Sequence, residues 1–208
     1  VILNISATER REVEQDLLVA NLSYVVTDKS SNSLQNEINT IMARAIKAAK
    51  AVEEIKVSTG AYQVYEFTEP RTKENKWRGS QSLTLKSKEA DKILDLTSKL
   101  QDMGLTMNGL DYVLAPETAI DIQDSLMEDA LKQLQERANR AAKALGKSSA
   151  ELRDVNVNSS GIPYEPAAYN RGAMMKMEMA ADSMAAPVAA AGDSTITLSV
   201  NARAILKP

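Results

Sequence analysis

The sequence predicts an α+β fold of mainly antiparallel strands with three long helices, arranged as βαββ-type units. Two observations carry this prediction. Segments in which apolar and polar residues alternate occur in adjacent pairs, and in the segments between them apolar residues recur every three or four positions. Paired strands separated by helices favour helices on one face of antiparallel sheets over a doubly wound parallel sheet.

The chain begins with two expected strands. Apolar residues alternate with polar ones over residues 1–8, and the pattern ends in the charged residues 9–12. A second alternation follows over residues 18–27. Because the two runs are adjacent, we expect them to form a hairpin with a polar bend.

A helix, a hairpin and a second helix are expected next. Residues 34–55 carry a helical apolar stripe of about six turns, and the serines before it are suited to cap the helix. Residues 55–87 resemble two strands joined by a charged surface turn. Residues 88–102 are again helical in pattern, and Gly104 is placed to stop that helix.

The longest helix is expected over residues 118–146, after a short strand at 105–115. Its charged residues lie opposite a stripe formed by Met127, Leu131, Leu134, Ala138, Ala141 and Leu145. Gly146 is placed to form a left-handed C-cap. Short alternating runs at 151–158 and 195–206 predict two further strands.

The composition excludes several classes of chemistry. The 208 residues contain no cysteine and no histidine, so disulfides, thiolate nucleophiles, Ser-His-Asp sites and His-based zinc sites are absent. The formal net charge of −3 gives no basic excess for a nucleic-acid partner. We therefore expect a protein that is not an enzyme, has no cofactor and does not bind nucleic acid.

Residues 161–192 are rich in Pro, Met and Ala, have no sustained period and are expected to form a flexible insert. Five of the nine methionines lie in this stretch: Met174, Met175, Met177, Met179 and Met184. Thioethers at every second position could bind Cu(I). Flexible packing and sacrificial oxidation to the sulfoxide are the alternatives, and the first of these is the ordinary role of such residues.

Two further groups have both a binding and a structural interpretation. The acidic residues Asp121, Asp124, Glu128 and Asp129 could hold Ca²⁺ or Mg²⁺, but they also complement the positive end of the longest helix. The aromatic residues Tyr62, Tyr65, Phe67 and Trp77 favour cross-strand packing in the hairpin, and an exposed part of them could serve subunit contact.

The chain begins at Val1, inside a strand pattern, which leads us to expect that an N-terminal segment such as a signal peptide was removed. It contains no run of 18 or more apolar residues, so we expect no transmembrane helix.

Two segments, EDALKQLQERANRAAKALG and IKVSTGAYQVYEF, resemble the signatures of a known family. It is the SIMPL-domain family of bacterial periplasmic proteins, which includes the periplasmic immunogenic protein and an oxidative-stress defence protein. The segment EDALKQLQERANRAAKALG is similar to the family's helix signature, with Ala130, Ala138 and Gly146 among the matching positions. The segment IKVSTGAYQVYEF resembles its "v.T..y.v.p.y" pattern at Thr59 and Tyr62. The usual "V.PD.A" entry to the second strand appears here as VEQDLLVA, without the proline.

The resemblance implies one domain over residues 1–208, with βαββ-type subdomains at about 1–88 and 89–208 as an alternative. It also implies a periplasmic protein whose signal peptide is removed, a homo-oligomer that is ring-like or channel-like in some members, and a role in oxidative-stress tolerance. It supplies no catalytic residues. We therefore expect a non-enzymatic protein that self-associates through unpaired strand edges such as residues 1–8 or 195–206. The alternative is a soft-metal or small-ligand binding module that uses the Met-rich segment, and an enzyme that uses carboxylates alone is a third class.

Overall fold

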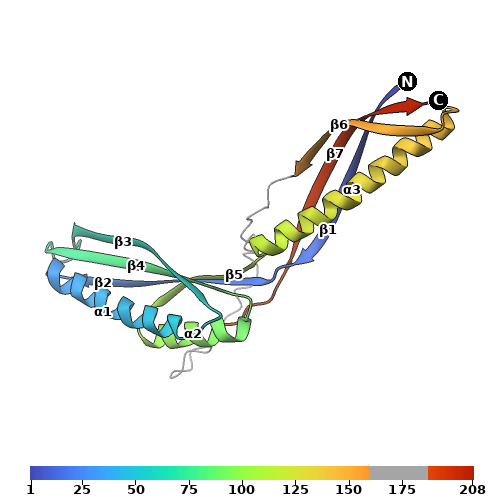
Figure 1. Cartoon of the computed structure of the whole chain (residues 1–208). Helices are drawn as coiled ribbons and strands as arrows, with labels where there is room; N and C mark the ends of the chain where they lie inside the picture. The colour runs from blue at the N-terminus through green and yellow to red at the C-terminus, as the bar shows by residue number, and fades with distance from the viewer. Residues whose placement is uncertain (160–186) are drawn as a thin grey trace, which may run out of the picture. The chain divides into compact units, whose positions relative to one another are not determined.

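The computed structural model describes residues 1–159 and 187–208, and the Met-rich residues of the expected insert lie outside these ranges. In the described part of the chain, seven strands form two antiparallel sheets with three helices (Figure 1), which confirms the α+β prediction. Two compact units contain these elements. Unit 1 comprises Val1–Gln15, residues 114–159 and Gly192–Pro208, and unit 2 comprises Asp16–Val113 with residues 187–191.

The boundaries of these units differ from the division near residue 88 considered from the sequence. The expected hairpin at the N-terminus is also wrong, because β1 (Ile2–Glu14) and β2 (Leu17–Asp28) belong to different sheets. β1 pairs along its length with β7 (Asp193–Lys207), from the other end of the chain. The backbone N–H of Gln15 donates to the carbonyl of Gly192 at 2.8 Å, where the chain leaves this pairing.

Unit 2 has the split-βαβ arrangement. Its further elements are α1 (Ser31–Lys50), β3 (Lys56–Thr68), β4 (Asn75–Ser87), α2 (Ala90–Asp102) and β5 (Thr106–Val113). The strand order is β3-β4-β2-β5, and every neighbouring pair is antiparallel. β2 and β3 are therefore parallel to each other with β4 between them, and α1 connects them. The expected hairpin at 55–87 is confirmed as β3 and β4.

The two helices of unit 2 cover one face of its sheet (Figure 1). α1 buries the stripe Leu34, Ile38, Met42, Ala45 and Ala49. The expected serine cap is present, since the Ser30 hydroxyl accepts from the N–H of Ser33. Gly104, with φ +97°, follows α2 as expected, because glycine adopts this left-handed conformation without a steric cost.

Unit 1 is a three-stranded sheet in the order β1-β7-β6, with β6 spanning Ser149–Ser159 and α3 spanning Pro116–Ala144. α3 runs along one face of the sheet (Figure 1). β7 is the central strand, so residues 195–206 are paired on both sides and are not the unpaired edge that the sequence suggested. β1 is an edge strand, as expected.

The buried stripe of α3 differs from the predicted one. Leu134 and Ala138 are buried as expected, but Leu145 is 57% exposed. The other deeply buried positions are Ala119, Leu126, Ala130 and Ala142. Steps of four residues advance the stripe by about 40° each around a helix of 3.6 residues per turn, so the stripe winds as the helix crosses a twisted sheet. The alanines also permit close approach of helix and sheet. The C-cap at Gly146 is confirmed by its φ of +68° and by the bond from Lys147 N–H to the carbonyl of Ala142 at 2.8 Å.

Among the described helices, none combines the length and the apolar character that crossing a membrane would require.

Candidate functional site

The strongest candidate for an interaction surface is the outer edge of β3. This strand is 13 residues long and stands at the end of its sheet, so one row of its backbone N–H and C=O groups has no strand partner in the described part of the chain. Residues 57–65 of β3 carry no charged side chain and no proline. A long edge without charges is a template for pairing with another chain.

Exposed apolar and aromatic side chains lie on β3 and elsewhere on its sheet. Tyr62 is 40% exposed and Tyr65 is 50% exposed. Val25, on β2, is 45% exposed and faces away from the helices, in the same cross-strand row as Ser80 and Gln63. Large side chains that remain exposed beside an open edge provide the apolar contact that strand pairing between chains needs.

A bulge interrupts the middle of β3. Gly60 and Ala61 together lie opposite Ser82, because the register shifts between Thr59 and Tyr62. A Cβ at Gly60 would lie 2.2 Å from the Ser82 hydroxyl oxygen, so a glycine allows this close approach. The bulge leaves two regular segments of edge, one on each side of it.

The edges of unit 1 are better protected. On β1, the Arg137 guanidinium donates to the carbonyl of Ser6 at 2.8 Å, and Arg11 is tied to Asp129 of α3 at 3.1 Å. On β6, a bulge at Asp154 and Val155 interrupts the ladder, and Asp154 has φ +53°. Charged side chains, a backbone carbonyl already bound by a side chain, and bulges all hinder the pairing of an edge strand with another chain.

The aromatic residues of the hairpin do not form one cluster. Trp77 packs against the core under α1, with Glu66 as its cross-strand partner. Tyr65 and Phe67 lie on the opposite face, across from Arg78 and Lys76. None of these aromatic residues on β3 therefore pairs directly with Trp77 on the opposite face of the sheet. For Tyr65, which is exposed, contact with another subunit is a better interpretation than cross-strand packing.

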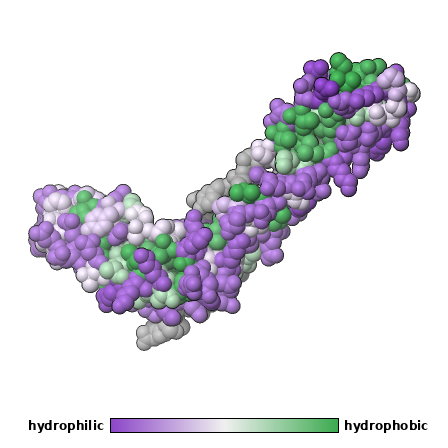
Figure 2. All heavy atoms as spheres, in the orientation of Figure 1, coloured by the Kyte–Doolittle hydropathy of each residue, from purple (hydrophilic) through white to green (hydrophobic). Residues whose placement is uncertain are grey.

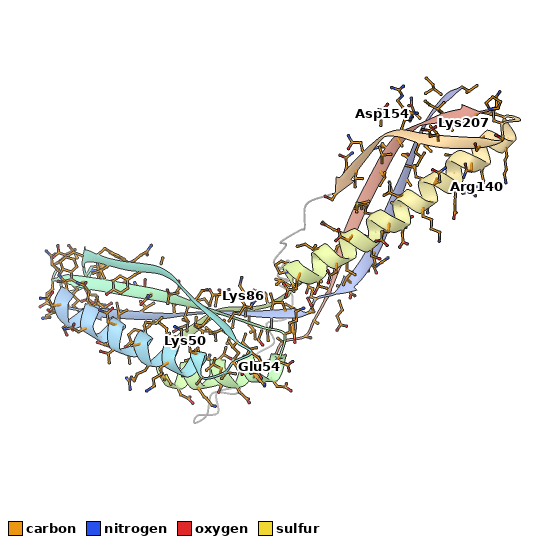
Figure 3. All side chains as sticks on the ribbon, viewed as in Figure 1. Lys50, Glu54, Lys86, Arg140, Asp154 and Lys207 are labelled. Atoms are coloured by element: carbon orange, nitrogen blue, oxygen red, sulfur yellow. The ribbon has the colours of Figure 1, made fainter. Side chains whose placement is uncertain are left out.

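Ion pairs fix the ends of several elements and shift the pKa values of their carboxyl groups. The Lys92 ammonium, by a hydrogen bond, lowers the pKa of Glu54, which follows α1 (Figure 3). The Lys76 ammonium likewise lowers the pKa of Glu69 at the turn between β3 and β4. In unit 1, hydrogen bonding to Lys207 and the charge of Arg153 lower the pKa of Glu151. In each pair the ammonium or guanidinium group stabilises the ionised carboxylate at the end of an element.

The other residues singled out from the sequence are not brought together into a site. Asp129 pairs with Arg11, and the described residues contain no group of three or more acidic side chains arranged to hold a metal ion. Hydrophilic residues cover the outward surface of α3 (Figure 2), as expected for a solvated helix face. Met174, Met175, Met177, Met179 and Met184 lie outside the described residues, so the metal hypothesis stays a prediction.

A family model matches residues 3–204, which is nearly the whole chain. The matching model is SIMPL, described as a protein of unknown function (DUF541). The chain belongs to the SIMPL family. A comparison with curated proteins finds no match.

Membership of the SIMPL family confirms the resemblance inferred from the helix and strand signatures. The matching positions now have structural explanations. Ala130 and Ala138 are fully buried on the face of α3 that packs against the sheet, Gly146 adopts a left-handed conformation, and Thr59 and Tyr62 flank the bulge of β3. These SIMPL positions therefore specify packing and chain geometry.

Proposed function

We propose that this SIMPL protein is a non-enzymatic periplasmic protein that self-associates through the outer edge of β3 and contributes to envelope or oxidative-stress tolerance. The observation that carries the proposal is the charge-free stretch at 57–65 on an exposed edge strand. The exposed Tyr62 and Tyr65 support it. The periplasmic location and the stress role rest on the resemblance to the family.

The mass of the protein in solution tests self-association. We expect light scattering to give a multiple of the 22.6 kDa chain, and a mass that rises with concentration if assembly is incomplete. Substituting Gln63→Glu and Tyr65→Glu together should shift the protein to the monomer, because two like charges would face each other when two β3 edges pair. Within the chain, these residues lie opposite Ser80 and Arg78, so the fold tolerates the new carboxylates.

The matched control places the same two charges on the exposed face of α1, as Asn36→Glu and Asn39→Glu. This variant should assemble like the unaltered protein. A monomer at every concentration, or equal assembly of the β3 variant and the unaltered chain, would contradict the proposal.

Osmotic-shock fractionation tests the periplasmic location, and retention of the protein with the cytoplasmic fraction would contradict it. Peroxide survival of a deletion strain tests the stress role, and unchanged survival would contradict that role.

The second candidate is a soft-metal or small-ligand binding module. The spacing of Met175, Met177 and Met179 favours it, because alternating thioethers suit Cu(I). Titration of Cu(I) against the protein and against a variant with all five methionines of the segment changed to leucine distinguishes the candidates. Equal uptake by the two proteins would exclude the thioether site.

A further inference from the structure

The outer face of the sheet in unit 1 carries a continuous array of short polar side chains. Side chains alternate along each strand, so residues opposite α3 lie together on this face. Cross-strand pairing aligns Ser6, Asn201 and Asn156 in one row. The next row contains Thr8, Ser199 and Asn158.

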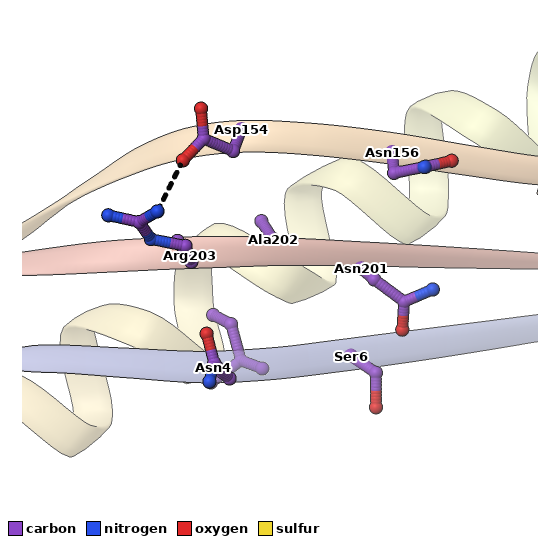
Figure 4. Close-up of a pocket in the computed structure, with 8 residues that line it drawn as sticks. Asn4, Ser6, Asp154, Asn156, Asn201, Ala202 and Arg203 are labelled. Atoms are coloured by element: carbon purple, nitrogen blue, oxygen red, sulfur yellow. Dashed lines mark ion pairs between the residues drawn. The ribbon is translucent and has the colours of Figure 1, made fainter.

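A hollow of about 380 Å³ lies on this face, across all three strands (Figure 4). Its volume is within the range of ligand sites, roughly 300–1,000 Å³. The polar residues that line it are Asn4, Ser6, Asp154, Asn156, Asn201 and Arg203. The lining therefore contains three amides and one hydroxyl, and Ile5 and Ala202 add apolar surface to it.

These groups have unused hydrogen-bonding capacity. Within residues 1–159 and 187–208, the side-chain amides of Asn4, Asn156 and Asn201 and the hydroxyl of Ser6 hydrogen-bond to no other protein group. Each amide offers two donors and one acceptor. By contrast, in the neighbouring row the hydroxyls of Thr8 and Ser199 bond to each other at 3.0 Å.

The bulge in β6 shapes one side of the hollow. Asp154 and Val155 together lie opposite Ala202, and the φ of +53° at Asp154 is costly for a residue with a side chain. In this conformation the Asp154 carboxylate reaches the Arg203 guanidinium at 3.2 Å, the ion pair drawn in Figure 4. Strained residues of this kind concentrate at binding sites.

The charges around the hollow are balanced. Arg203 is paired with Asp154, and Arg153, which lies directly opposite Arg203, is paired with Glu151 at 2.9 Å. Each guanidinium charge is offset by a neighbouring carboxylate, so these two pairs give an anionic ligand no net positive charge to bind. An apolar ligand would leave the amides without partners, which costs binding energy.

We propose that this hollow binds a neutral polyhydroxylated ligand, namely a segment of an uncharged oligosaccharide. Neighbouring hydroxyls both donate and accept hydrogen bonds, as the three asparagine amides and Ser6 do. The open sheet surface continues past the hollow along the row of Thr8, Ser199 and Asn158, which suits an extended chain of sugars. Unit 2 and its β3 edge contribute no residue to this site.

The test uses the full-length protein labelled with ¹⁵N, with chitotetraose and maltotetraose as neutral probes and an oligogalacturonate as the anionic probe. Each is added up to about 10 mM, a range that includes weak binding. We expect the side-chain amide signals of Asn4, Asn156 and Asn201 to shift with at least one neutral probe. The double variant Asn156→Ala and Asn201→Ala should bind about tenfold more weakly or worse, because two hydrogen-bonding groups are lost.

The control variant Asn32→Ala and Asn39→Ala removes two exposed amides from α1 and should bind as the unaltered protein does. Both altered pairs are on the surface, and equal thermal unfolding of the variants confirms that the fold is kept. The charged β3 variant should also keep its binding, so this result is independent of self-association. Shifts with the anionic probe alone, no shift with either neutral probe, or unchanged affinity of the Asn156 and Asn201 variant would overturn the proposal.

Discussion

At the scale of single residues, glycines decide how closely elements approach each other. Gly79 is buried on β4 beneath α1, and a Cβ there would lie 2.4 Å from Leu34 Cδ2 and 2.6 Å from Ile38 Cδ1. The missing side chain is therefore what allows the two apolar residues of α1 to rest on the strand. Gly109 on β5 differs, because a Cβ added there would lie 3.6 Å from the nearest atom, an ordinary van der Waals distance.

We expect Gly79→Ala to lower the free energy of unfolding by about 1–3 kcal/mol, the usual cost of overpacking a core. The matched substitution Gly109→Ala should be neutral or slightly stabilising, since it restricts the unfolded chain without a clash. Urea unfolding of both variants measures the difference. Equal stability of the two would show that Leu34 and Ile38 move aside at no cost.

The polar residues of the hollow show what is predictable at this scale. Alternation along residues 1–8 already places Asn4 and Ser6 on one face of a strand. It does not reveal that Asn156 and Asn201, at the other end of the chain, lie beside them. That proximity depends on strand pairing, and on a bulge that leaves no clear pattern in the sequence around Asp154.

At the scale of elements, the spacing of apolar residues predicted the strands and helices. It was wrong about which side chains are buried where that depends on the surface against which an element packs. In α3 the predicted stripe included Leu145, but that residue lies at the end of the helix, beyond the part that rests on the sheet, and is exposed. The observed stripe follows Leu126, Ala130, Leu134, Ala138 and Ala142. Its winding is set by the twist of the underlying sheet, which the helix sequence alone does not contain.

Strand edges depend on pairing in the same way. β3 and β7 are both long and apolar in pattern, yet β3 is an edge and β7 is central. The suggestion that residues 195–206 form an unpaired edge is wrong, because β7 pairs with β1 on one side and with β6 on the other. The length and regular alternation of this strand allow it to pair on both sides.

At the scale of the whole molecule, surface ion pairs make stability depend on pH. The folded-state pKa values of Glu54, Glu69 and Glu151 lie below the usual value of 4.5. Their stabilising contribution is complete above that usual value and is lost as the pH falls through the lowered values. The pKa values of Lys76 and Lys92 are raised above 10.5, so their contribution is complete below 10.5 and is lost as the pH rises further.

We therefore expect the midpoint of thermal unfolding to change little near neutral pH and to decrease below about pH 4.5. The decrease should be modest and smaller in high salt, because these pairs are at the surface. The double variant Glu54→Gln and Glu151→Gln should lose part of this acid dependence, whereas Glu128→Gln, at an exposed position of α3, should keep it. An equal decrease of the thermal midpoint below pH 4.5 in the unaltered protein and in both variants would show that Glu54 and Glu151 do not cause it.

The sequence by itself determined the α+β class, the SIMPL membership, most elements and the absence of cysteine and histidine chemistry. These follow from residue type and from spacing along the chain, which are local properties. Only the tertiary structure decided that β1 pairs with β7, that the chain divides into two interleaved units, and that β3 is the exposed edge. Pairing between distant strands depends on surfaces that form only when the chain folds, so the hollow around Asn156 and Asn201 belongs to the structure alone.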